Sequence, residues 1–583
     1  MATQTKENKI TEVRFEGFDG IDGYAAHSGG ASVSDMVNFR ILEDGSVEKR
    51  CGYRKIGEFP EAPAAFWCGR VFDNLYLYAW LKNYTYRYDF SAGTVSRVGA
   101  PIGDHDLSKP KFLFFGGNLY LSIIDGIYHI AHNGFMSDMS GYAPLVGKDW
   151  TNDLVGEINE PLNILNRRAR FTYTVSDTPS IFFRVLYPVK TIDSVKVNGI
   201  ELDSSMYYFD SLYNSVNISK LEARDKVEIA VTYDLADSSQ LASLFASDHI
   251  EVFGGMSNSR IFAWSDAAGS MVYSTGYISP SQDAANGQVY TTPSKKSLYF
   301  PEGYEFKVGN GDSVIKAIAR HYDRLLFFTE KGVWMADNET CALEPIPAMN
   351  INSSRGCSVT GGVAIAGNDP ISVGQNRILR WTSDTDELNE CNAYCISEPI
   401  SHLLPEGFFA NAKVTALNSR PEVWFYDPTD TEGTVWIYQW EKKVWYRFGG
   451  ILADHIFEAE GQICFIRDKY LYRFDESAIY DYDDTTEISY IKARLESGYI
   501  ELGSERSRRL KGISIRGEQL DRTELTLSPD GLAESVYSFS ESTGEHKLLQ
   551  KRMSSGRFRQ MKLKIESNYK ERTRIHGISL SVK

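Results

Sequence analysis

Residues 323–338 read DRLLFFTEKGVWMADN, and this stretch decides the fold. An apolar run at 325–328 precedes the turn at 330–332, and a second short apolar run follows the turn. The turn ends in glycine, which tolerates the positive φ angles that tight hairpin turns require. Aromatic and aliphatic side chains favour the pleated, half-buried surface of a sheet. The stretch therefore predicts a β-hairpin of two short strands.

The same pattern of strand, tight turn and strand recurs from about residue 62 to 150 and from about 240 to 480. Its instances are 70–90, 112–131, 259–276, 323–338, 367–384, 421–448 and 461–477. Units of about 35–50 residues that hold several short strands are typical of propeller blades. One blade is a small sheet that cannot bury both faces alone, so neighbouring blades must supply the core. We predict an all-β fold built on a β-propeller of about seven blades, within a range of six to eight.

Two stretches depart from this pattern. Residues 156–237 alternate apolar and polar positions, as at 227–233, and Asn198-Gly199 is a hairpin turn signal. We predict a small β-sandwich there, inserted in a loop where it disturbs the scaffold least. The predicted domains are an N-terminal arm and hairpin at 1–60, the first propeller blades at 61–155, the inserted β-sandwich at 156–237, the remaining blades at 238–482 and a C-terminal β-sandwich at 483–583. A short helix is expected only near 238–248.

The N-terminal residues before Asp35 are polar, rich in glycine and without periodicity. They predict an extended arm or loop, either docked or disordered. Immediately after them, Phe39 and Ile41 lead into the turn at 43–46, which contains Asp-Gly, and Val47 follows the turn. Asp-Gly between two short alternating runs predicts a hairpin.

The charge is unevenly distributed. The net charge of the chain is −15, which argues against a protein that binds nucleic acid over its whole surface. Residues 491–583 contain 19 Lys and Arg against 12 Asp and Glu, a net +7, so the first 490 residues carry −22. The start of the chain shows no apolar signal region, and no stretch is apolar enough for a membrane span. We expect a soluble protein made in the cytoplasm.

No residues fit a known catalytic or metal-binding spacing. His129 and His132 would not converge on one face of a strand, and the seven scattered cysteines make no zinc motif. Asp481, with Asp483 and Asp484, is expected in a solvated linker. There is no phosphate loop and no nucleophile elbow. The sequence predicts a non-enzymatic protein with no catalytic residue, no cofactor and no metal, although a site assembled from distant loops would leave no local motif.

The basic run at 506–511 has two interpretations. It can be a solvated sheet face with protein–protein salt bridges, or it can contact DNA with a salt-dependent affinity.

Two motifs resemble the tail-nozzle and packaged-DNA stabilisation proteins of bacteriophages. In the first motif, an asparagine and an aromatic residue precede a turn that contains glycine. A basic residue, an arginine, any residue, a glycine and an aromatic residue then follow. The variable position is Cys51 here, where these proteins commonly have proline. The residues of the first motif are Asn38, Phe39, Gly45, Lys49, Arg50, Gly52 and Tyr53. The second motif is a Gly-aromatic step before a basic strand. Its residues are Ser497, Gly498, Tyr499, Leu502, Gly503, Arg508, Arg509 and Lys511.

The resemblance implies a virion protein that assembles in the bacterial host cytoplasm. It would form a homo-hexameric ring in the tail, below the portal and adaptor, which lines the DNA exit conduit and helps to retain and release the genome. The implied partners are copies of itself, the head-to-tail adaptor, tail fibres or spikes and, transiently and non-specifically, double-stranded phage DNA. The alternative from another class is a carbohydrate-binding or glycan-cleaving β-propeller that acts on host surface polysaccharide. Cleavage would require two carboxylates about 5–10 Å apart.

Overall fold

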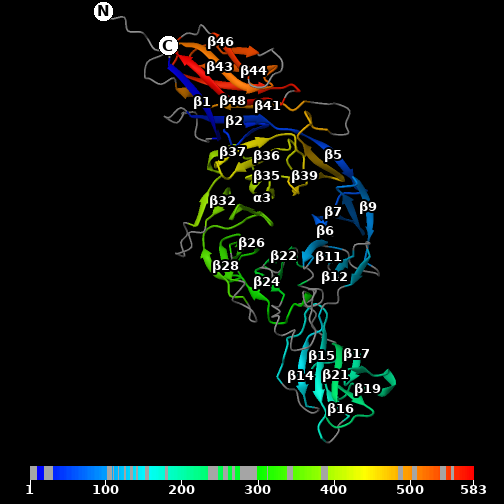
Figure 1. Ribbon diagram of the computed structural model, residues 1–583. Helices are drawn as coiled ribbons and strands as arrows, with labels where there is room; N and C mark the ends of the chain where they lie inside the picture. The colour runs from blue at the N-terminus through cyan, green and yellow to red at the C-terminus, as the bar shows by residue number, and fades with distance from the viewer. Residues whose placement is uncertain are drawn as a thin grey trace, which may run out of the picture. The chain divides into compact units, whose positions relative to one another are not determined.

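The computed structural model describes residues 9–582 with gaps, of which the longest are 19–29, 102–107, 234–243, 254–259, 276–297, 338–345, 383–391, 483–489, 502–507 and 539–546. Nearly all of its regular structure is β-strand (Figure 1). The chain divides into two compact units, residues 63–353 and residues 1–62 with 354–583. Among the described residues, no helix has the length and apolar character needed to cross a membrane. The helix expected near 238–248 falls largely outside the described residues.

The unit at 63–353 contains four antiparallel sheets of four strands, each in chain order. They are β6 (Ala65–Val71), β7 (Asn74–Leu81), β8 (Tyr84–Asp89) and β9 (Thr94–Gly99); β10 (Lys111–Phe115), β11 (Asn118–Ile123), β12 (Gly126–Ile130) and β13 (Met136–Asp138); β22 (His249–Phe253), β23 (Arg260–Trp264), β24 (Met271–Ser274) and β25 (Phe306–Lys307); and β26 (Ile315–His321), β27 (Arg324–Thr329), β28 (Val333–Asp337) and β29 (Met349–Asn352). The first strands of the first three sheets adjoin, with β10 against both β6 and β22, and the fourth sheet shares a hydrophobic core with the third.

The unit formed by 1–62 and 354–583 contains three more four-stranded arrays. They are β30 (Val363–Ala366), β31 (Asp369–Gly374), β32 (Arg377–Trp381) and β33 (Ala393–Cys395); β34 (Lys413–Ala416), β35 (Glu422–Tyr426), β36 (Val435–Gln439) and β37 (Val444–Phe448); and β38 (His455–Ala459), β39 (Gln462–Arg467) and β40 (Tyr470–Asp475), completed by β5 (Gly52–Glu58). Here too the first strands adjoin, with β34 against β30 and β38. The last array therefore takes its outer strand from the N-terminal region of the chain.

Each of the seven stretches predicted to form strand–turn–strand units contributes the central strands of one four-stranded array. Asp73, Gly117 and Asp468 adopt the positive φ that their turns predict, between paired strands. Gly332 does not adopt positive φ; glycine is needed there because a Cβ would lie 2.6 Å from the carbonyl oxygen of Asn352. The hairpin around Gly45 joins β3 (Phe39–Ile41) to β4 (Val47–Lys49). Short-range turn chemistry thus fixes the position of the strands along the chain.

The inserted sandwich has two sheets that enclose a core of its own. One sheet contains β14 (Leu145–Trp150), β15 (Arg168–Thr174), β17 (Val189–Val197), β18 (Ile200–Glu201) and β21 (Lys226–Tyr233). The other has the order β16 (Phe182–Arg184), β20 (Ser215–Ile218), β19 (Tyr207–Asp210). Its strands start at Leu145, before the predicted boundary at 156, because β14 pairs with β15 in parallel.

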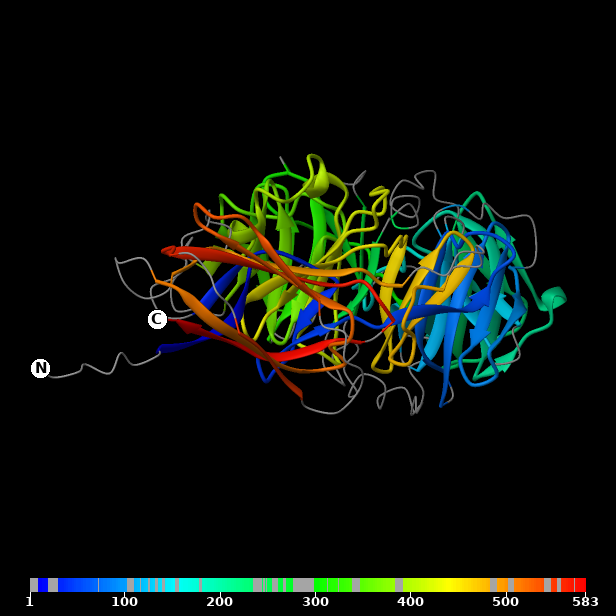
Figure 2. The same ribbon diagram turned by 90° about the horizontal axis from the view of Figure 1, so that it is seen from above.

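The C-terminal sandwich includes strands from both ends of the sequence. Its C-terminal members are β41 (Ala493–Ser497), β42 (Ile500–Glu501), β43 (Leu510–Glu518), β44 (Thr523–Pro529), β45 (Ser535–Ser538), β46 (Lys547–Arg552), β47 (Gln560–Ser567) and β48 (Arg574–Val582). Figures 1 and 2 show β1 (Lys9–Phe18), in blue, beside the red β48, with which it pairs antiparallel. The end of β1 then pairs in parallel with β2 (Gly30–Val37), which also pairs with β41.

The prediction of an arm or loop before Asp35 is therefore corrected for the described residues. Lys9–Phe18 and Gly30–Val37 are strands, and this part of the N-terminal region is docked. The backbone groups of β1 and β2 form hydrogen bonds with strands more than 400 residues away, and the local sequence does not reveal these partners.

Candidate functional site

Arg50 is the centre of a buried junction in the unit formed by 1–62 and 354–583. Its guanidinium donates from Nη1 and Nη2 to the two carboxylate oxygens of Asp481, at 2.7 and 2.6 Å. It also donates to the carbonyls of Gly449 and Cys51, and from Nε to the side-chain oxygen of Asn38 at 2.8 Å. All five N–H donors of the Arg50 guanidinium are thus used. Lysine could not make the same set of hydrogen bonds, because it has three donors on a single nitrogen.

Burial acts to lower the pKa of Arg50, but the facing carboxylate of Asp481 outweighs it and the pKa is raised. The guanidinium therefore stays charged inside the protein. The expected solvated linker is wrong for Asp481, because its carboxylate is the counterion of a buried arginine. Asp483 and Asp484 lie outside the described residues.

Asn38 connects three segments at the same place. The backbone of Asn38 adopts φ +58°. Its side-chain nitrogen, Nδ2, donates to the carbonyl of Lys492 at 2.8 Å. Its side-chain oxygen accepts from Gly449 N as well as from Arg50, and its backbone N–H donates to the carbonyl of Arg447. Asparagine tolerates this left-handed backbone better than most residues, so one residue ends β2 and binds it to the turn after β37.

The other residues of the first motif surround this junction. Lys49 Nζ donates to the carbonyl of Tyr569 at 2.6 Å. A Cβ on Gly52 would lie 1.9 Å from the carbonyl oxygen of Tyr480, so only glycine fits there. Tyr53 packs edge-on against Phe465, and its hydroxyl donates to the carbonyl of Gly450. Phe39 is fully buried in the core, and Gly45 holds the hairpin turn at φ +81°.

The second motif lies on the C-terminal sandwich. Gly498 is buried and accepts a hydrogen bond from Ser497, and the ring of Tyr499 lies 4.7 Å from Lys562 Nζ. Arg508 pairs with Phe558 through the backbone, whereas Arg509 and Lys511 are exposed. Leu502 and Gly503 lie outside the described residues, as does Arg506 of the basic run. Exposure of Arg509 and Lys511 leaves both interpretations of the basic run open.

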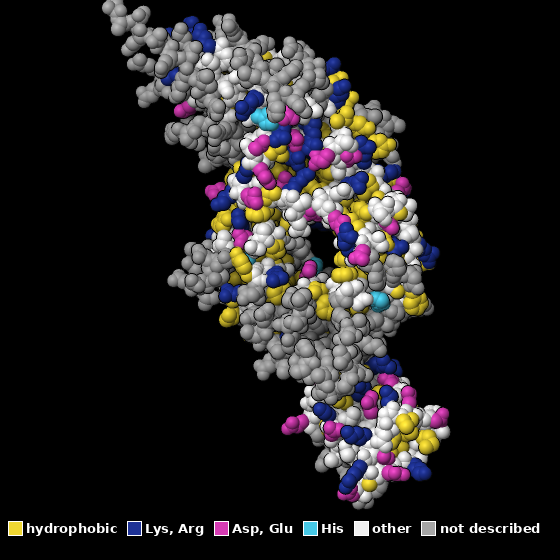
Figure 3. Space-filling view, in the orientation of Figure 1, with side chains coloured by type: hydrophobic (Ala, Val, Ile, Leu, Met, Phe, Trp, Pro, Cys, Tyr) yellow, Lys and Arg dark blue, Asp and Glu magenta, His cyan; other side chains and the backbone are white. Residues whose placement is uncertain are grey.

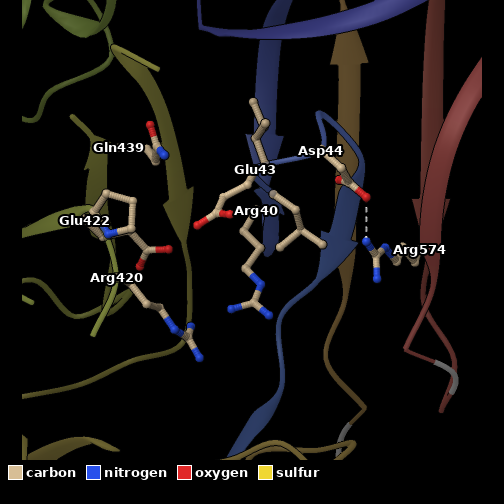
Figure 4. A pocket seen from close by; sticks show the side chains of 10 residues that line it. Arg40, Glu43, Asp44, Arg420, Glu422, Gln439 and Arg574 are labelled. Carbon is tan, nitrogen blue, oxygen red and sulfur yellow. Dashed lines mark hydrogen bonds and ion pairs between the residues drawn. The ribbon is translucent and has the colours of Figure 1, made fainter. Parts of the chain in front are cut away.

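A cleft of about 400 Å³ opens beside the β3–β4 hairpin (Figure 4). Its lining residues are Arg40, Ile41, Leu42, Glu43, Asp44, Arg420, Pro421, Glu422, Gln439 and Arg574. Figure 4 shows Asp44 joined to Arg574, with 2.7 Å between carboxylate and guanidinium, while Arg40 extends from the hairpin toward Arg420. The cleft thus has arginines and carboxylates from three separate segments.

Two of the three arginines of this cleft, Arg40 and Arg420, belong to an ion-pair network. Arg40 lies 2.6 Å from Glu48, and Arg420 lies 2.9 Å from Glu476. Arg572 contacts both of these glutamates and so connects the two pairs. Only the Arg40–Glu48 pair is local in the sequence, because these residues face each other across the predicted hairpin. The rest of the network gives no signal, because Arg572 lies 532 residues from Arg40. Networks of several charges stabilise more than isolated surface pairs do.

Two of the three carboxylates that line the cleft, those of Glu422 and Asp44, are committed to structural contacts. Glu422 accepts hydrogen bonds from Trp424 Nε1 at 2.9 Å and from the buried hydroxyl of Tyr446 at 2.8 Å. Partial burial acts to raise the pKa of Asp44, but hydrogen bonds from Ser46 and the ion pair with Arg574 together lower it to about 2. A carboxyl with so low a pKa is a poor general acid near neutral pH. These contacts therefore hold the chain segments around the cleft together, and they suit that role better than acid–base chemistry.

Among the residues that the structure describes, no three His, Cys, Asp or Glu side chains gather as metal ligands. Burial lowers the pKa of His129, and His132 is outside the described part of the chain.

No protein-family model matches the chain, and neither does any curated protein. Similarity to solved structures is remote. A chain of a mitotic checkpoint complex is 9% identical with a TM-score of 0.34, and the match covers 73% of this chain and 96% of that one. An exo-β-1,3-galactanase of Phanerochaete chrysosporium is 10% identical with a TM-score of 0.17, covering 83% and 97%. The Kluyveromyces lactis protein Hsv2 is 8% identical with a TM-score of 0.24, covering 67% and 98%. Similarities this low identify no function for the chain.

Proposed function

We propose that this chain is a non-enzymatic structural subunit of a bacteriophage tail, with a seven-bladed β-propeller at its centre. The propeller is supported within each unit by four-stranded arrays that adjoin one another. It is also supported by β5, which completes the sheet of β38–β40. Strand β5 lies more than 400 residues before β40 in the sequence, so this array forms only when distant parts of the chain pair.

The observation that carries the proposal is the junction around Arg50. Residues of the first motif, among them Asn38, Lys49, Arg50 and Tyr53, meet in a buried, hydrogen-bonded cluster that joins the hairpin, two four-stranded arrays and the C-terminal sandwich. A cluster of this kind holds domains in a fixed arrangement, which is a requirement of a ring subunit that must meet its neighbours in a repeating way.

The charge pattern supports a conduit role. A wall with net negative charge would repel DNA phosphates, so that the genome slides past it. The chain carries −15 in all, with the positive excess confined to its C-terminal part. The inserted sandwich and the C-terminal sandwich differ in composition and are the candidates for the unlike patches that a closed ring requires.

The test is assembly of the purified chain, alone and with the portal and adaptor proteins of the same genome. We expect a homo-hexameric ring by light scattering and electron microscopy, at the latest when the adaptor is present, and no release of reducing ends from bacterial surface polysaccharides. A chain that stays monomeric with portal and adaptor would overturn the proposal. Polysaccharide cleavage by the purified chain would support the glycan-cleaving alternative instead.

A further inference from the structure

The three-stranded sheet of the inserted sandwich has two different faces. Phe183, Val216 and Ile218 point inward and are fully buried in the core of the sandwich. Because side chains alternate along a strand, the residues between them point to the opposite, outer face. This outer face is the subject of the inference.

Strand register arranges the outer face in two rows. Pairing of β20 with β16 and β19 places one row of three residues beside another. The first row is Phe182, Asn217 and Tyr208, and the second row is Arg184, Ser215 and Asp210. Each row has a polar residue of β20 in its centre and longer side chains on both sides, so the centre of the face is polar and enclosed.

The central polar groups are buried and have no partner in the described protein. Asn217 is only 6% exposed, and its side-chain amide makes no hydrogen bond to any described residue. The hydroxyl of Ser215 is buried and is likewise unpaired among the described residues. Buried polar side chains are nearly always hydrogen-bonded in native proteins. An amide has two donors and a carbonyl acceptor, so Asn217 is able to bind a ligand that both gives and accepts hydrogen bonds.

Aromatic rings flank this polar centre and are held at the surface. Tyr208 is 62% exposed and Tyr213 is 55% exposed, and Tyr213 packs edge-on against Phe182 with ring centroids 6.3 Å apart. Figure 3 shows hydrophobic side chains at the surface over β19, next to charged ones. Exposed aromatic rings offer a large, rigid and weakly polar contact surface at a low entropic cost.

The second row adds two charged groups of opposite sign. Arg184 is exposed and forms no ion pair with a described residue. Asp210 accepts hydrogen bonds from Leu212 N and Tyr213 N with Oδ1 alone, which leaves Oδ2 available. A planar guanidinium and a carboxylate can each bind two adjacent hydroxyl groups.

We propose that the outer face of the sheet β16–β20–β19 binds a pyranose unit of a polysaccharide. Sugar rings have an apolar C–H face, which would stack on Tyr208, and a rim of hydroxyls that both donate and accept, which would bond to Asn217 and Asp210. Nucleic acid fits the face less well, because Arg184 and Asp210 cancel in charge. A protein partner fits less well too, because the centre of a protein interface is apolar whereas this centre is polar.

This inference does not rest on the proposed tail function. The face lies on a sandwich with its own core, and binding can be measured on the purified full chain whether or not it forms rings. A failure of ring assembly and a failure of sugar binding are therefore separate outcomes.

The experiment screens the full chain on an array of defined oligosaccharides of hexoses, amino sugars and deoxyhexoses. The oligosaccharide that binds best is then titrated by calorimetry against the wild type, Tyr208→Ala, Asn217→Ala and Tyr322→Ala. Tyr322 is 51% exposed in the turn between β26 and β27 and provides the same chemical change away from the face. We expect binding to weaken roughly tenfold or more in the first two variants, from loss of a stacking or hydrogen-bonding contact, and to be unchanged in Tyr322→Ala.

Three results would overturn the inference. The wild type could retain no oligosaccharide, or the wild type and Tyr208→Ala could bind with equal affinity. Binding could also be lost when the salt concentration is raised from about 0.05 to about 0.5 M, which would indicate attraction between charges. Because Tyr208 is exposed, its variant tests the face without risk to the fold. The thermal midpoint of Asn217→Ala, compared with that of the wild type, shows whether that variant reports on binding alone.

Discussion

At the scale of single residues, Arg50 is the side chain on which the junction depends most. Only 2% of its side chain is exposed, and its loss would leave the carboxylate of Asp481 without its counterion. We expect Arg50→Met to lower the free energy of unfolding by about 3–5 kcal/mol, the usual cost of removing one partner of a buried ion pair. Urea denaturation followed by tryptophan fluorescence measures it.

The matched control is Arg54→Met. Arg54 pairs with Asp475 at 3.0 Å but is 53% exposed, so this change should cost less than about 1 kcal/mol. If Arg50→Met and Arg54→Met lose equal free energy of unfolding, the buried junction does not stabilise the protein more than an exposed ion pair does.

His455 makes stability depend on pH. Its pKa is lowered to about 4, chiefly by burial and then by Lys413, whereas Asp454 acts in the opposite direction. The unfolded histidine takes up a proton near pH 6.5 and the folded one only near pH 4, so stability is lost as pH falls through this window. We expect a loss of about 2–3 kcal/mol between pH 7 and pH 4.

His455→Gln should remove most of this pH dependence, because glutamine does not titrate. His402, which is exposed, is the control, and His402→Gln should leave the pH dependence as in the wild type. Urea midpoints at pH 7 and pH 4 for the three proteins provide the measurement. If His455→Gln keeps the wild-type change in stability between pH 7 and pH 4, that change comes from a group other than His455.

Residue chemistry also decides what can be predicted from the sequence. Gly45, Asp73 and Gly199 lie in turns that their own backbone preferences require, and all three adopt positive φ. Asp481 was misinterpreted for a physical reason, because its counterion Arg50 lies 431 residues away. The same holds for the outer face around Asn217, whose neighbours meet only through strand register.

At the scale of elements, β1 is the strand whose position the sequence conceals. It pairs with β48 over Lys9–Val13 and with β2 over the rest of its length. Deletion of residues 2–18 should therefore expose the edge of β48 and destabilise the C-terminal sandwich. Hydrogen exchange should show faster exchange of those β48 amides within 578–582 whose N–H groups point toward β1; the alternate amides point toward β43 and should stay protected.

Deletion of residues 2–8 serves as the control, since none of the described pairings of β1 involves them. Unchanged protection of β48 after the longer deletion would contradict the pairing. Local alternation of polar and apolar residues is too weak in this segment to predict a strand, and only the distant partner makes it one.

At the scale of the whole molecule, the inserted sandwich is the part most able to fold alone. All members of its core cluster lie between Val146 and Tyr233. Residues 142–234 produced alone should unfold cooperatively on heating, as followed by near-ultraviolet circular dichroism. Residues 313–353, which form one four-stranded sheet, should not, because Leu325 and Phe327 share a core with Phe262 and Trp264 of another sheet.

The pairing of β1 with β48 also sets the order of events during synthesis. Strand β1 leaves the ribosome well before β48, because its partner at 578–582 is made about 570 residues later. At about 5–20 residues per second, this is a delay of roughly half a minute to two minutes. Throughout that time the edge of β1 that later pairs with β48 has only water or another chain to bond to, so the N-terminal strand cannot reach its final pairing while the chain is still being made.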